Sequence, residues 1–529
     1  MIQHIKRLLG IGKPNPARGN SIVVNVERLE RRVALLEEGV LEEYTVEREG
    51  DQNIVGGIFK GRVKNIEGGL KAMFVDIGLD KNAFLHFWDA IPAALDGGLE
   101  EIQREGKRKQ QKKITSKDIP DIYPIGSEIV IQVSKGPIGT KGPRVTTNIS
   151  LAGRYLVLMP FTEQFGISRK IEDPKERARL RKIVQKLAVP EGMGIIMRTI
   201  AQGTRARHFV RDLHMLLEQW DEIEARRANN PAPACIFQEP GLIERTARDF
   251  LTDEIDQVMC DDAATTEMIR EIAGKISRRA KRRIHYMPTT AGQPIFERVG
   301  IQKQIDEAFS RQVWLPCGGY IVIDETEALI AIDVNTGRNR GSKDVDKMIL
   351  ETNVEAAQEV ARQLRLRNIG GLVVIDLIDM RHRKDQQTVY KAIKDRLKKD
   401  KAKTQVLQIS PVGLMEMTRQ RLNESLRDSM YEPCPYCQGR ARVKTPMTMS
   451  VEIQRRLNTV IQKHRDTLGD IIVIVNTDVL NRFKSEDAKL LVELERSHSG
   501  RLIFRSDPTL NRERFAIIDA TTEKTIDQG

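Results

Sequence analysis

Residues 329–335 read LIAIDVN and residues 373–379 read VVIDLID, and these two short runs decide how the rest of the chain is interpreted. Each run has the apolar composition of a buried strand, yet each carries aspartate near its end. Burying an ionised carboxylate among apolar groups costs on the order of several kcal/mol unless a partner compensates. These acids therefore need an explanation beyond packing.

The segment between the two runs predicts a crossover connection. Residues 344–367 place apolar or small side chains at helical spacing, and Gly370 and Gly371 follow as stop signals. Upstream, residues 318–335 (GGYIVIDETEALIAIDVN) predict a hairpin with its turn near 325–328. Strand, helix and strand in this order predict two parallel strands that lie close in one sheet.

Ligands of such sheets gather at the carboxyl ends of the strands, and Asp333 and Asp376 both lie near those ends. Asn335 shares a strand face with Asp333 because side chains alternate with a period of two. Two adjacent carboxylates repel each other unless a cation lies between them. Oxygen ligands alone suit Mg²⁺ or Mn²⁺. The sequence thus favours a metal site.

A structural role for the acids is the alternative. In that interpretation they cap strands or pair with nearby arginines, the candidates being Arg338, Arg340 and Arg381. Asp379 lies on the opposite strand face, and we expect it to form such a structural pair.

The bulk composition narrows the class of protein. A chain of 529 residues exceeds one hydrophobic core, so we expect three or four domains. No apolar run approaches the roughly 18 residues of a membrane span, and the N-terminal apolar stretch is too short for a secretory signal. We therefore expect a cytoplasmic protein. The net charge of +12 and the pI near 9.3 favour a polyanionic partner.

The remaining chain divides by pattern. Residues 21–50 predict two strands joined by a turn near Glu38 and Gly39. From residue 52, short strands with glycine turns predict a small barrel, interrupted by a basic loop, REGKRKQQKK, at 104–113. Residues 318–430 alternate strands with helices, which is typical of an α/β domain.

Among the five cysteines, only Cys434 and Cys437 form a CxxC pair. A structural Zn²⁺ site needs four ligands, and the chain has no second CxxC. The pair is therefore either a redox dithiol or half of a zinc site that a second chain completes.

The barrel and the segment after it carry candidate RNA contacts. Phe74 and Phe84 are either core residues or rings on which an OB barrel stacks bases. Lys141, in the glycine-rich turn 136–144, could meet phosphates, although that turn lacks the spacing of a Walker loop. Arg198 and Thr199 end an apolar strand, where they form either a phosphate site or a surface salt bridge and a turn hydroxyl.

Taken together, these motifs resemble the ribonuclease E/G family of bacterial endoribonucleases over roughly residues 20–520. The resemblance is carried by GGYIVIDETEALIAIDVNTGRNRG, ETNVEAAQEVARQLRLRNIGGLVVIDLIDM, LMEMTRQRL, CPYCQGR, FVDIG, NISLAGRYLVLMP, GISRKI and GMGIIMRT. It is closer to the branch of the family without a long disordered tail. The chain departs from the family pattern in its N-terminal extension and in the basic loop.

The resemblance implies a multidomain α/β and α+β fold. Its expected parts are an N-terminal extension (1–20), a ribonuclease H-like domain (21–51 and 244–308), an inserted OB-fold RNA-binding domain (52–147), a 5′-end sensor region (148–243), a catalytic α/β domain resembling deoxyribonuclease I (309–430), a zinc link (431–445), a small α/β domain (446–520) and a tail (521–529).

The resemblance also implies Mg²⁺-dependent cleavage of single-stranded RNA, stimulated by a 5′-monophosphate, in rRNA and tRNA processing and mRNA decay. The implied residues are Asp333 and Asp376 for Mg²⁺, Asn335 in support, Phe74, Phe84 and Lys141 for RNA, Arg198, Thr199, Arg169 and the backbone of Val157 for the 5′-phosphate, and Cys434 and Cys437 for a Zn²⁺ shared within a homodimer. The resemblance leaves open whether two such dimers assemble into a higher oligomer. A non-catalytic RNA-binding protein and a DNA nuclease are the alternatives.

Overall fold

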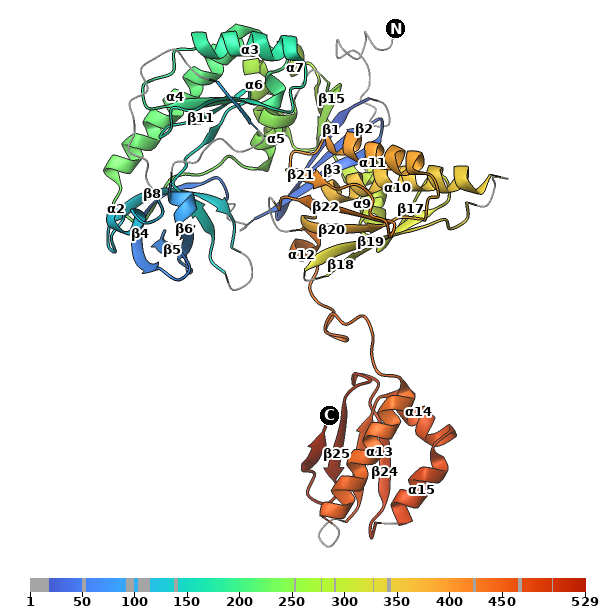
Figure 1. Ribbon diagram of the computed structural model, residues 1–529. Helices are drawn as coiled ribbons and strands as arrows, with labels where there is room; N and C mark the ends of the chain where they lie inside the picture. Colours follow the sequence, from blue (N-terminus) through green and yellow to red (C-terminus); the bar gives the residue numbers. More distant parts are fainter. Residues whose placement is uncertain are drawn as a thin grey trace. The chain divides into compact units, whose positions relative to one another are not determined.

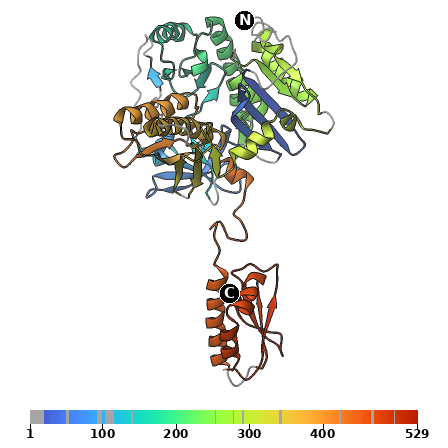
Figure 2. The same cartoon turned by 90° about the vertical axis from the view of Figure 1, so that its right-hand side faces the viewer.

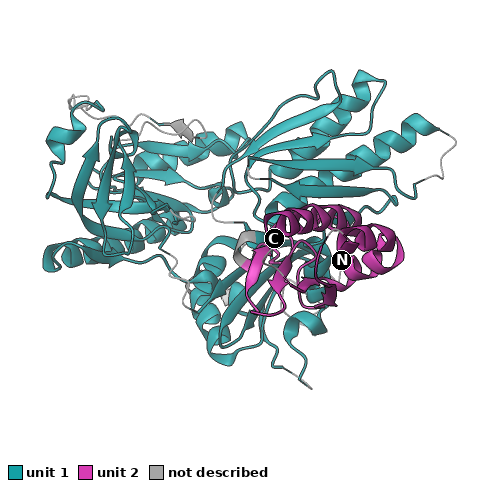
Figure 3. Cartoon of the chain, turned by 90° about the horizontal axis from the view of Figure 1, so that it is seen from below, with its two compact units in different colours: residues 1–429 teal, residues 430–529 magenta. Residues whose placement is uncertain are grey.

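The computed structural model places the chain in two compact units, residues 1–429 and 430–529 (Figure 3). It describes residues 19–49, 54–91, 99–102, 115–137, 141–251, 254–276, 278–289, 292–326, 328–339, 344–421, 425–464, 469–496 and 498–529. Within these ranges, no helix is both long enough and apolar enough to cross a membrane.

The first sheet of unit 1 has the strand order β16-β15-β1-β2-β3. Its strands are β1 (Ser21–Val26), β2 (Glu30–Glu37), β3 (Val40–Arg48), β15 (Gln257–Cys260) and β16 (Ile284–Tyr286), with helices α5 (Leu242–Phe250), α6 (Ala263–Ile276), α7 (Arg278–Lys281), α8 (Ile295–Arg298) and α9 (Ile301–Ala308). The expected turn at Glu38 and Gly39 is present, and both residues have positive φ. Three strands precede residue 49 rather than two, because the polar residues 27 and 28 end β1 early.

The second sheet closes into a barrel, as the glycine-punctuated pattern predicted. Its five strands are β4 (Ile58–Glu67), β5 (Ala72–Asp76), β6 (Ala83–His86), β9 (Arg144–Thr146) and β8 (Glu128–Lys135), and β4 pairs with β8 to close it. Strand β14 (Ala234–Phe237) adds to β4 from outside. A closed five-stranded barrel is consistent with an OB fold. The basic run 104–113 lies outside the described residues.

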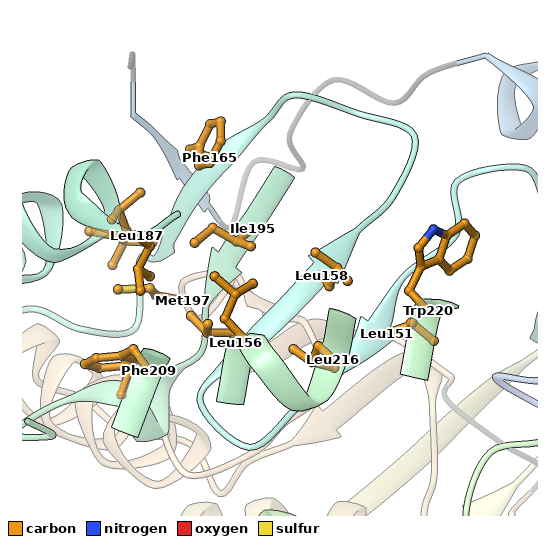
Figure 4. Packing of buried hydrophobic residues seen from close by; sticks show 14 of the residues in the cluster. Leu151, Leu156, Leu158, Phe165, Leu187, Ile195, Met197, Phe209, Leu216 and Trp220 are labelled. Atoms are coloured by element: carbon orange, nitrogen blue, oxygen red, sulfur yellow. The ribbon is translucent and has the colours of Figure 1, made fainter. Parts of the chain in front are cut away.

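The third sheet has the order β10-β11-β13-β12-β7. Its strands are β10 (Leu151–Ala152), β11 (Leu156–Met159), β13 (Gly194–Met197), β12 (Phe165–Ser168) and β7 (Leu99–Glu101), accompanied by α3 (Pro174–Lys186) and α4 (Ala206–Asn229). Leu156 and Met197 from the sheet pack against Phe209 of α4 in one apolar cluster (Figure 4). Because β7 joins this sheet, residues of the expected barrel range 52–147 contribute to two sheets.

The fourth sheet contains the two strands that end in aspartate. Its order is β17-β18-β19-β20-β22-β21, with β17 (Gln312–Trp314), β18 (Tyr320–Glu325), β19 (Leu329–Asn335), β20 (Gly371–Asp376), β22 (Leu414–Arg419) and β21 (Thr404–Val406). The predicted hairpin and crossover are confirmed, since β18 and β19 are antiparallel and β19 and β20 parallel. Helices α10 (Val345–Leu366) and α11 (Arg383–Leu397) lie side by side over one face of this sheet (Figures 1 and 2).

Ion pairs join β3 of the first sheet to the two helices that cover the fourth sheet. Glu42 of β3 is 2% exposed and accepts hydrogen bonds from Arg365 of α10 and Arg396 of α11. Breaking a buried pair by removing one partner leaves an uncompensated charge, which is strongly destabilising. The two sheets are therefore fixed to each other within unit 1.

Unit 2 is a small α/β module with the sheet order β24-β23-β25-β26. Its elements are α13 (Pro446–Lys463), β23 (Ile471–Val475), α14 (Thr477–Ser485), α15 (Ala488–Arg496), β24 (Leu502–Ser506), β25 (Phe515–Asp519) and β26 (Thr525–Gln528). Residues 521–529, expected as a tail, contain β26, which pairs with β25.

Candidate active site and neighbouring binding surfaces

The two strand-end aspartates are direct neighbours. Asp333 and Asp376 are Cα partners in the parallel pairing of β19 with β20. Both side chains are exposed on the face opposite α10 and α11, since the flanking Ile332 and Ile375 are buried beneath those helices. Backbone pairing therefore places the Cα atoms of the two aspartates one strand spacing apart, ~4.8 Å.

Asn335 contacts Asp333 from the same strand face, on which the strand period predicted it to lie. Its Nδ2 donates a hydrogen bond to Asp333 Oδ2 at 2.8 Å. In the described part of the chain, no arginine or lysine forms an ion pair with Asp333 or Asp376, and Arg340 lies outside that part. The predicted structural pair of Asp379 is likewise absent among the described residues. Two neighbouring carboxylates without a cationic side chain favour the metal interpretation.

Two buried polar residues of α10 hold the loops that follow the strands, a role that the sequence pattern alone did not indicate. Asn353 donates to the Ile378 carbonyl at 2.8 Å and accepts from the Ile378 amide at 3.1 Å. Thr352 Oγ1 accepts a hydrogen bond from Asn339 Nδ2 at 3.1 Å. Both helix residues are fully buried. The signal that could have found them was a polar Thr-Asn pair inside an otherwise apolar stripe.

The donor set fits Mg²⁺. Among the described residues, no group of three or more histidines, cysteines and acids could hold a metal, but Mg²⁺ commonly takes one or two carboxylates and completes its shell with water and phosphate oxygens. Asp333 and Asp376 supply carboxylate oxygens on one open face, and Asn335 occupies only one of them. The arrangement could bind such an ion and a phosphodiester together.

On the barrel, Phe74 and Phe84 lie outside the core. They are cross-strand partners on β5 and β6, with ring centroids 5.8 Å apart and an interplanar angle of 71°. Their neighbours Met73 and Leu85 are fully buried inside the barrel, whereas the two phenylalanines are half-buried on its outer face. The alternative interpretation, in which both phenylalanines belong to the barrel core, is therefore wrong.

Lys141 is exposed close to these rings. It lies one residue before Gly142, and Pro143 accepts the backbone hydrogen bond of Phe84 at 2.7 Å. Arg144, the next basic residue, is already paired with Asp89 at 2.7 Å. Lys141 is therefore the cation of this segment that a bound phosphate could meet.

The four residues expected at the 5′-phosphate come from neighbouring strands. Arg198 and then Thr199 directly follow β13, Arg169 directly follows β12, and these two strands are parallel. Val157 lies on β11, opposite Ile196 of β13. Thr199 Oγ1 is 3.2 Å from Ser168 Oγ. The sheet thus brings the predicted hydroxyl and the two arginines to one edge.

Arg198 is partly committed to protein partners. Its Nη1 donates to the Gly153 carbonyl at 2.6 Å and to Asp249 Oδ1 at 2.7 Å. Burial raises the pKa of Asp249, but the guanidinium groups of Arg198 and Arg248 outweigh it and hold that pKa below its usual range. The alternative interpretation predicted a salt bridge for Arg198, and the pair with Asp249 is that salt bridge. It orients the guanidinium through Nη1, one of its two terminal nitrogens.

A buried acid shapes the turn beneath Arg198. Asp212 of α4 accepts hydrogen bonds from the backbone amides of Arg154, Tyr155 and Leu156 at 3.1, 2.8 and 2.9 Å. This turn carries the Gly153 carbonyl that contacts Arg198. Sequence reasoning missed both Asp212 and Asp249, because their partners are distant in the chain.

Cys434 and Cys437 lie on a turn of unit 2 that is tied to its sheet domain. Asn511 Nδ2 donates to the Tyr436 carbonyl and the Arg512 amide donates to the Tyr436 hydroxyl at 3.1 Å. Backbone hydrogen bonds from Cys437 and Tyr436 hold the pKa of the exposed Cys434 thiol below its usual range. Two thiols on one turn, one of them biased towards thiolate, fit half of a tetrahedral zinc site.

Comparison with known proteins identifies the class. A model of the ribonuclease E/G family matches residues 150–422, more than half of the chain. The chain belongs to this family and is an endoribonuclease of RNA processing.

Individual relatives extend the match over nearly the whole sequence. Ribonuclease G of Escherichia coli K12 is 38% identical over 498 residues, which cover 94% of this chain and 99% of the relative. Ribonuclease G of Haemophilus influenzae is 35% identical with the same coverage. Ribonuclease E of Escherichia coli K12 is 36% identical over 475 residues, 89% of this chain but 43% of that protein. The expected resemblance to the shorter branch of the family is therefore confirmed.

Proposed function

We propose that this endoribonuclease cleaves single-stranded RNA in a Mg²⁺-dependent reaction at Asp333 and Asp376, leaving a 5′-phosphate on the downstream product. The observation that carries the proposal is the cross-strand pairing of these two carboxylates on the open face of the nuclease sheet. The family match favours this reaction over a non-catalytic RNA-binding role and over DNA cleavage.

The chain's own residues prepare the reaction. Asp333 and Asp376 would hold the ion, and Asn335 fixes the Asp333 carboxylate through its hydrogen bond. Bound Mg²⁺ would supply a polarised water and charge stabilisation at the scissile phosphate. Thr352 and Asn353 hold the loops after both strands, so the acids sit on a framework that does not need to rearrange.

The barrel would bind the RNA strand. Phe74 and Phe84 offer rings on its outer face, and Lys141 offers a charge beside them. Aromatic stacking next to a basic group is how OB folds bind single strands. We assign these three residues to substrate binding.

A 5′-end sensor would stimulate cleavage. Arg198, Thr199, Arg169 and the Val157 backbone line one edge of the third sheet, where an arginine fork and a hydroxyl suit a single phosphate group. We infer that a 5′-monophosphate binds there. Such an enzyme would act in rRNA and tRNA processing and in mRNA decay, in the bacterial cytoplasm.

Two chains would share one Zn²⁺ through Cys434 and Cys437. Each chain offers two thiols on a fixed turn, and a structural site needs four ligands. We therefore propose a zinc-linked homodimer. By strand order, we also assign the first sheet to a ribonuclease H-like domain and the fourth to a nuclease domain resembling deoxyribonuclease I.

The test is digestion of end-labelled single-stranded RNA and DNA of one sequence, with Mg²⁺ or with a chelator. We expect cleavage of RNA and not of DNA, and only with Mg²⁺. Asp333→Asn and Asp376→Asn should lose turnover while they still bind RNA. Asp385→Asn, in the first turn of α11, makes the same charge change away from the acid pair and should leave turnover unchanged. Normal turnover by either aspartate variant would refute the metal assignment.

A further inference from the structure

The face of the fourth sheet opposite α10 and α11, which carries the two acids, also carries two aromatic side chains and an arginine that the proposed reaction does not use. Trp314, at the end of β17, is 53% exposed. Its ring lies 5.3 Å from that of Tyr320, centroid to centroid, at an interplanar angle of 61°. The guanidinium carbon of Arg338 lies 5.4 Å from the Trp314 ring centroid. A tryptophan, a tyrosine and an arginine thus form one surface platform.

The strand register places this platform beside the two acids. Trp314 pairs with Tyr320, and Tyr320 pairs with Asn335, across three adjacent strands. Asp333 and Asp376 form the next row on the same face, two residues along the strands. At ~4.8 Å per strand, the Cα of Trp314 lies roughly 10 Å from that of Asn335. Asp333 lies two residues further along β19, so its Cα is roughly 12 Å from that of Trp314. The Trp314 side chain together with one nucleotide that flanks a phosphate held at the acids spans this distance.

The fold does not require these side chains. Val313 and Ile321 fill the core beneath β17 and β18, and Trp314 is absent from that apolar cluster. Within the described ranges, no carboxylate forms an ion pair with Arg338, so its charge stays available. An exposed ring stacks on the face that every base presents, and an adjacent guanidinium adds attraction to phosphate.

We propose that Trp314, supported by Tyr320 and Arg338, is a stacking subsite for one unpaired base of the RNA, next to the cleaved phosphodiester. The proposal rests on the assignment of Asp333 and Asp376 as the cleavage site. The subsite accepts any base, because stacking reads the π face and not the hydrogen-bonding edge. It helps to position the strand and touches no reacting atom.

The experiment combines protein variants with RNA in which one base at a time is removed. Full-length unmodified protein, Trp314→Ala and Trp314→Phe are assayed on 5′-monophosphorylated oligonucleotides that carry a single abasic ribose on either side of the cut. On intact RNA, Trp314→Ala should raise KM about 5- to 150-fold with little change in kcat, the range of one lost stack, and Trp314→Phe should recover most of that loss. One abasic position should impair the unmodified protein and leave Trp314→Ala unaffected.

Two control variants separate stacking at Trp314 from a general loss of aromatic surface and from misfolding. Tyr286→Ala removes a comparably exposed aromatic from β16 in another sheet and should change nothing. Trp314→Leu keeps an apolar side chain at the strand end, so it gives the same test if the alanine variant fails to fold. A KM penalty that is equal on every abasic RNA, or no penalty, overturns the subsite. Normal cleavage by Asp376→Asn would instead overturn the active-site assignment, whatever the abasic pattern.

Discussion

At the scale of single residues, Asn353 holds the loop that follows Asp376, although it contacts neither aspartate. Replacing it with leucine keeps the branched shape at Cγ but leaves the Ile378 amide and carbonyl without their partners, which costs about 1–3 kcal/mol per unsatisfied group. We expect Asn353→Leu to raise the Mg²⁺ concentration needed for half-maximal cleavage. In metal-free protein, hydrogen exchange of residues 376–382 should accelerate.

Gln363→Leu is the matched control for Asn353. Gln363 is buried in the same helix, where it contacts Glu359 and Arg367 rather than a strand-end loop. An equal Mg²⁺ shift in both variants would show general destabilisation and not loop positioning.

Arg198 yields a second prediction at this scale. A charge-assisted contact is worth about 1.5–3 kcal/mol, so Arg198→Ala should reduce the preference for 5′-monophosphorylated over 5′-hydroxyl RNA by roughly tenfold or more. Slow, end-independent cleavage should remain, because the acid pair lies in another sheet. Rates on the two RNAs measure this directly.

The control is Arg227→Ala, which removes an arginine of α4 that pairs with Glu224. It should leave the end preference intact. Equal cleavage of both RNAs by the unmodified protein, or an unchanged preference in Arg198→Ala, would exclude a sensor at this edge.

Site residues could be predicted from sequence where a local rule fixes their position, and not where they depend on a partner elsewhere in the chain. Asp333, Asn335 and Asp376 could be placed from sequence because strand period and the crossover rule fix their faces and ends. Asn353 is marked in the sequence only as a polar residue within an apolar stripe. The partners of Asn353 and Asp249 could not be named, because they lie 25 and 51 positions away along the chain. Only folding brings those groups together.

At the scale of elements, the barrel allows stability and binding to be separated. Phe74→Ala and Phe84→Ala should each weaken RNA binding by about 1–3 kcal/mol while changing thermal stability little, since both rings lie outside the core. Met73→Ala, on the inner face of the same strand, should instead cost about 2–5 kcal/mol of stability.

Fluorescence anisotropy with labelled RNA and thermal unfolding read out these two effects. If the phenylalanine variants unfold and Met73→Ala does not, the outward assignment of the rings is wrong.

Long, periodic elements could be predicted and short ones could not. The hairpin, the helix 345–366 and the following strand repeat their pattern over several turns or alternations. Strands β7 and β14 span three and four residues, too few for a period to appear, and each pairs with a sheet or strand distant in sequence. Their positions depend on tertiary contacts.

At the scale of the whole molecule, the half set of thiols predicts assembly. We expect about one Zn²⁺ per two chains, and Cys434→Ser should lose the metal and shift the protein towards monomer. Elemental analysis combined with light scattering measures both quantities. Cys235→Ser, which changes an exposed cysteine outside the CxxC turn, should alter neither. A stable dimer without zinc would contradict the shared site.

The pairing of Asp333 with Asp376 has one further consequence. Their spacing is set by the backbone hydrogen bonds of two parallel strands and not by a loop. Insertions and substitutions in the surrounding loops can therefore accumulate over evolution without retuning the gap between the acids. Substrate preference can drift among descendants of such a sheet, while the ion-binding geometry is inherited with the fold.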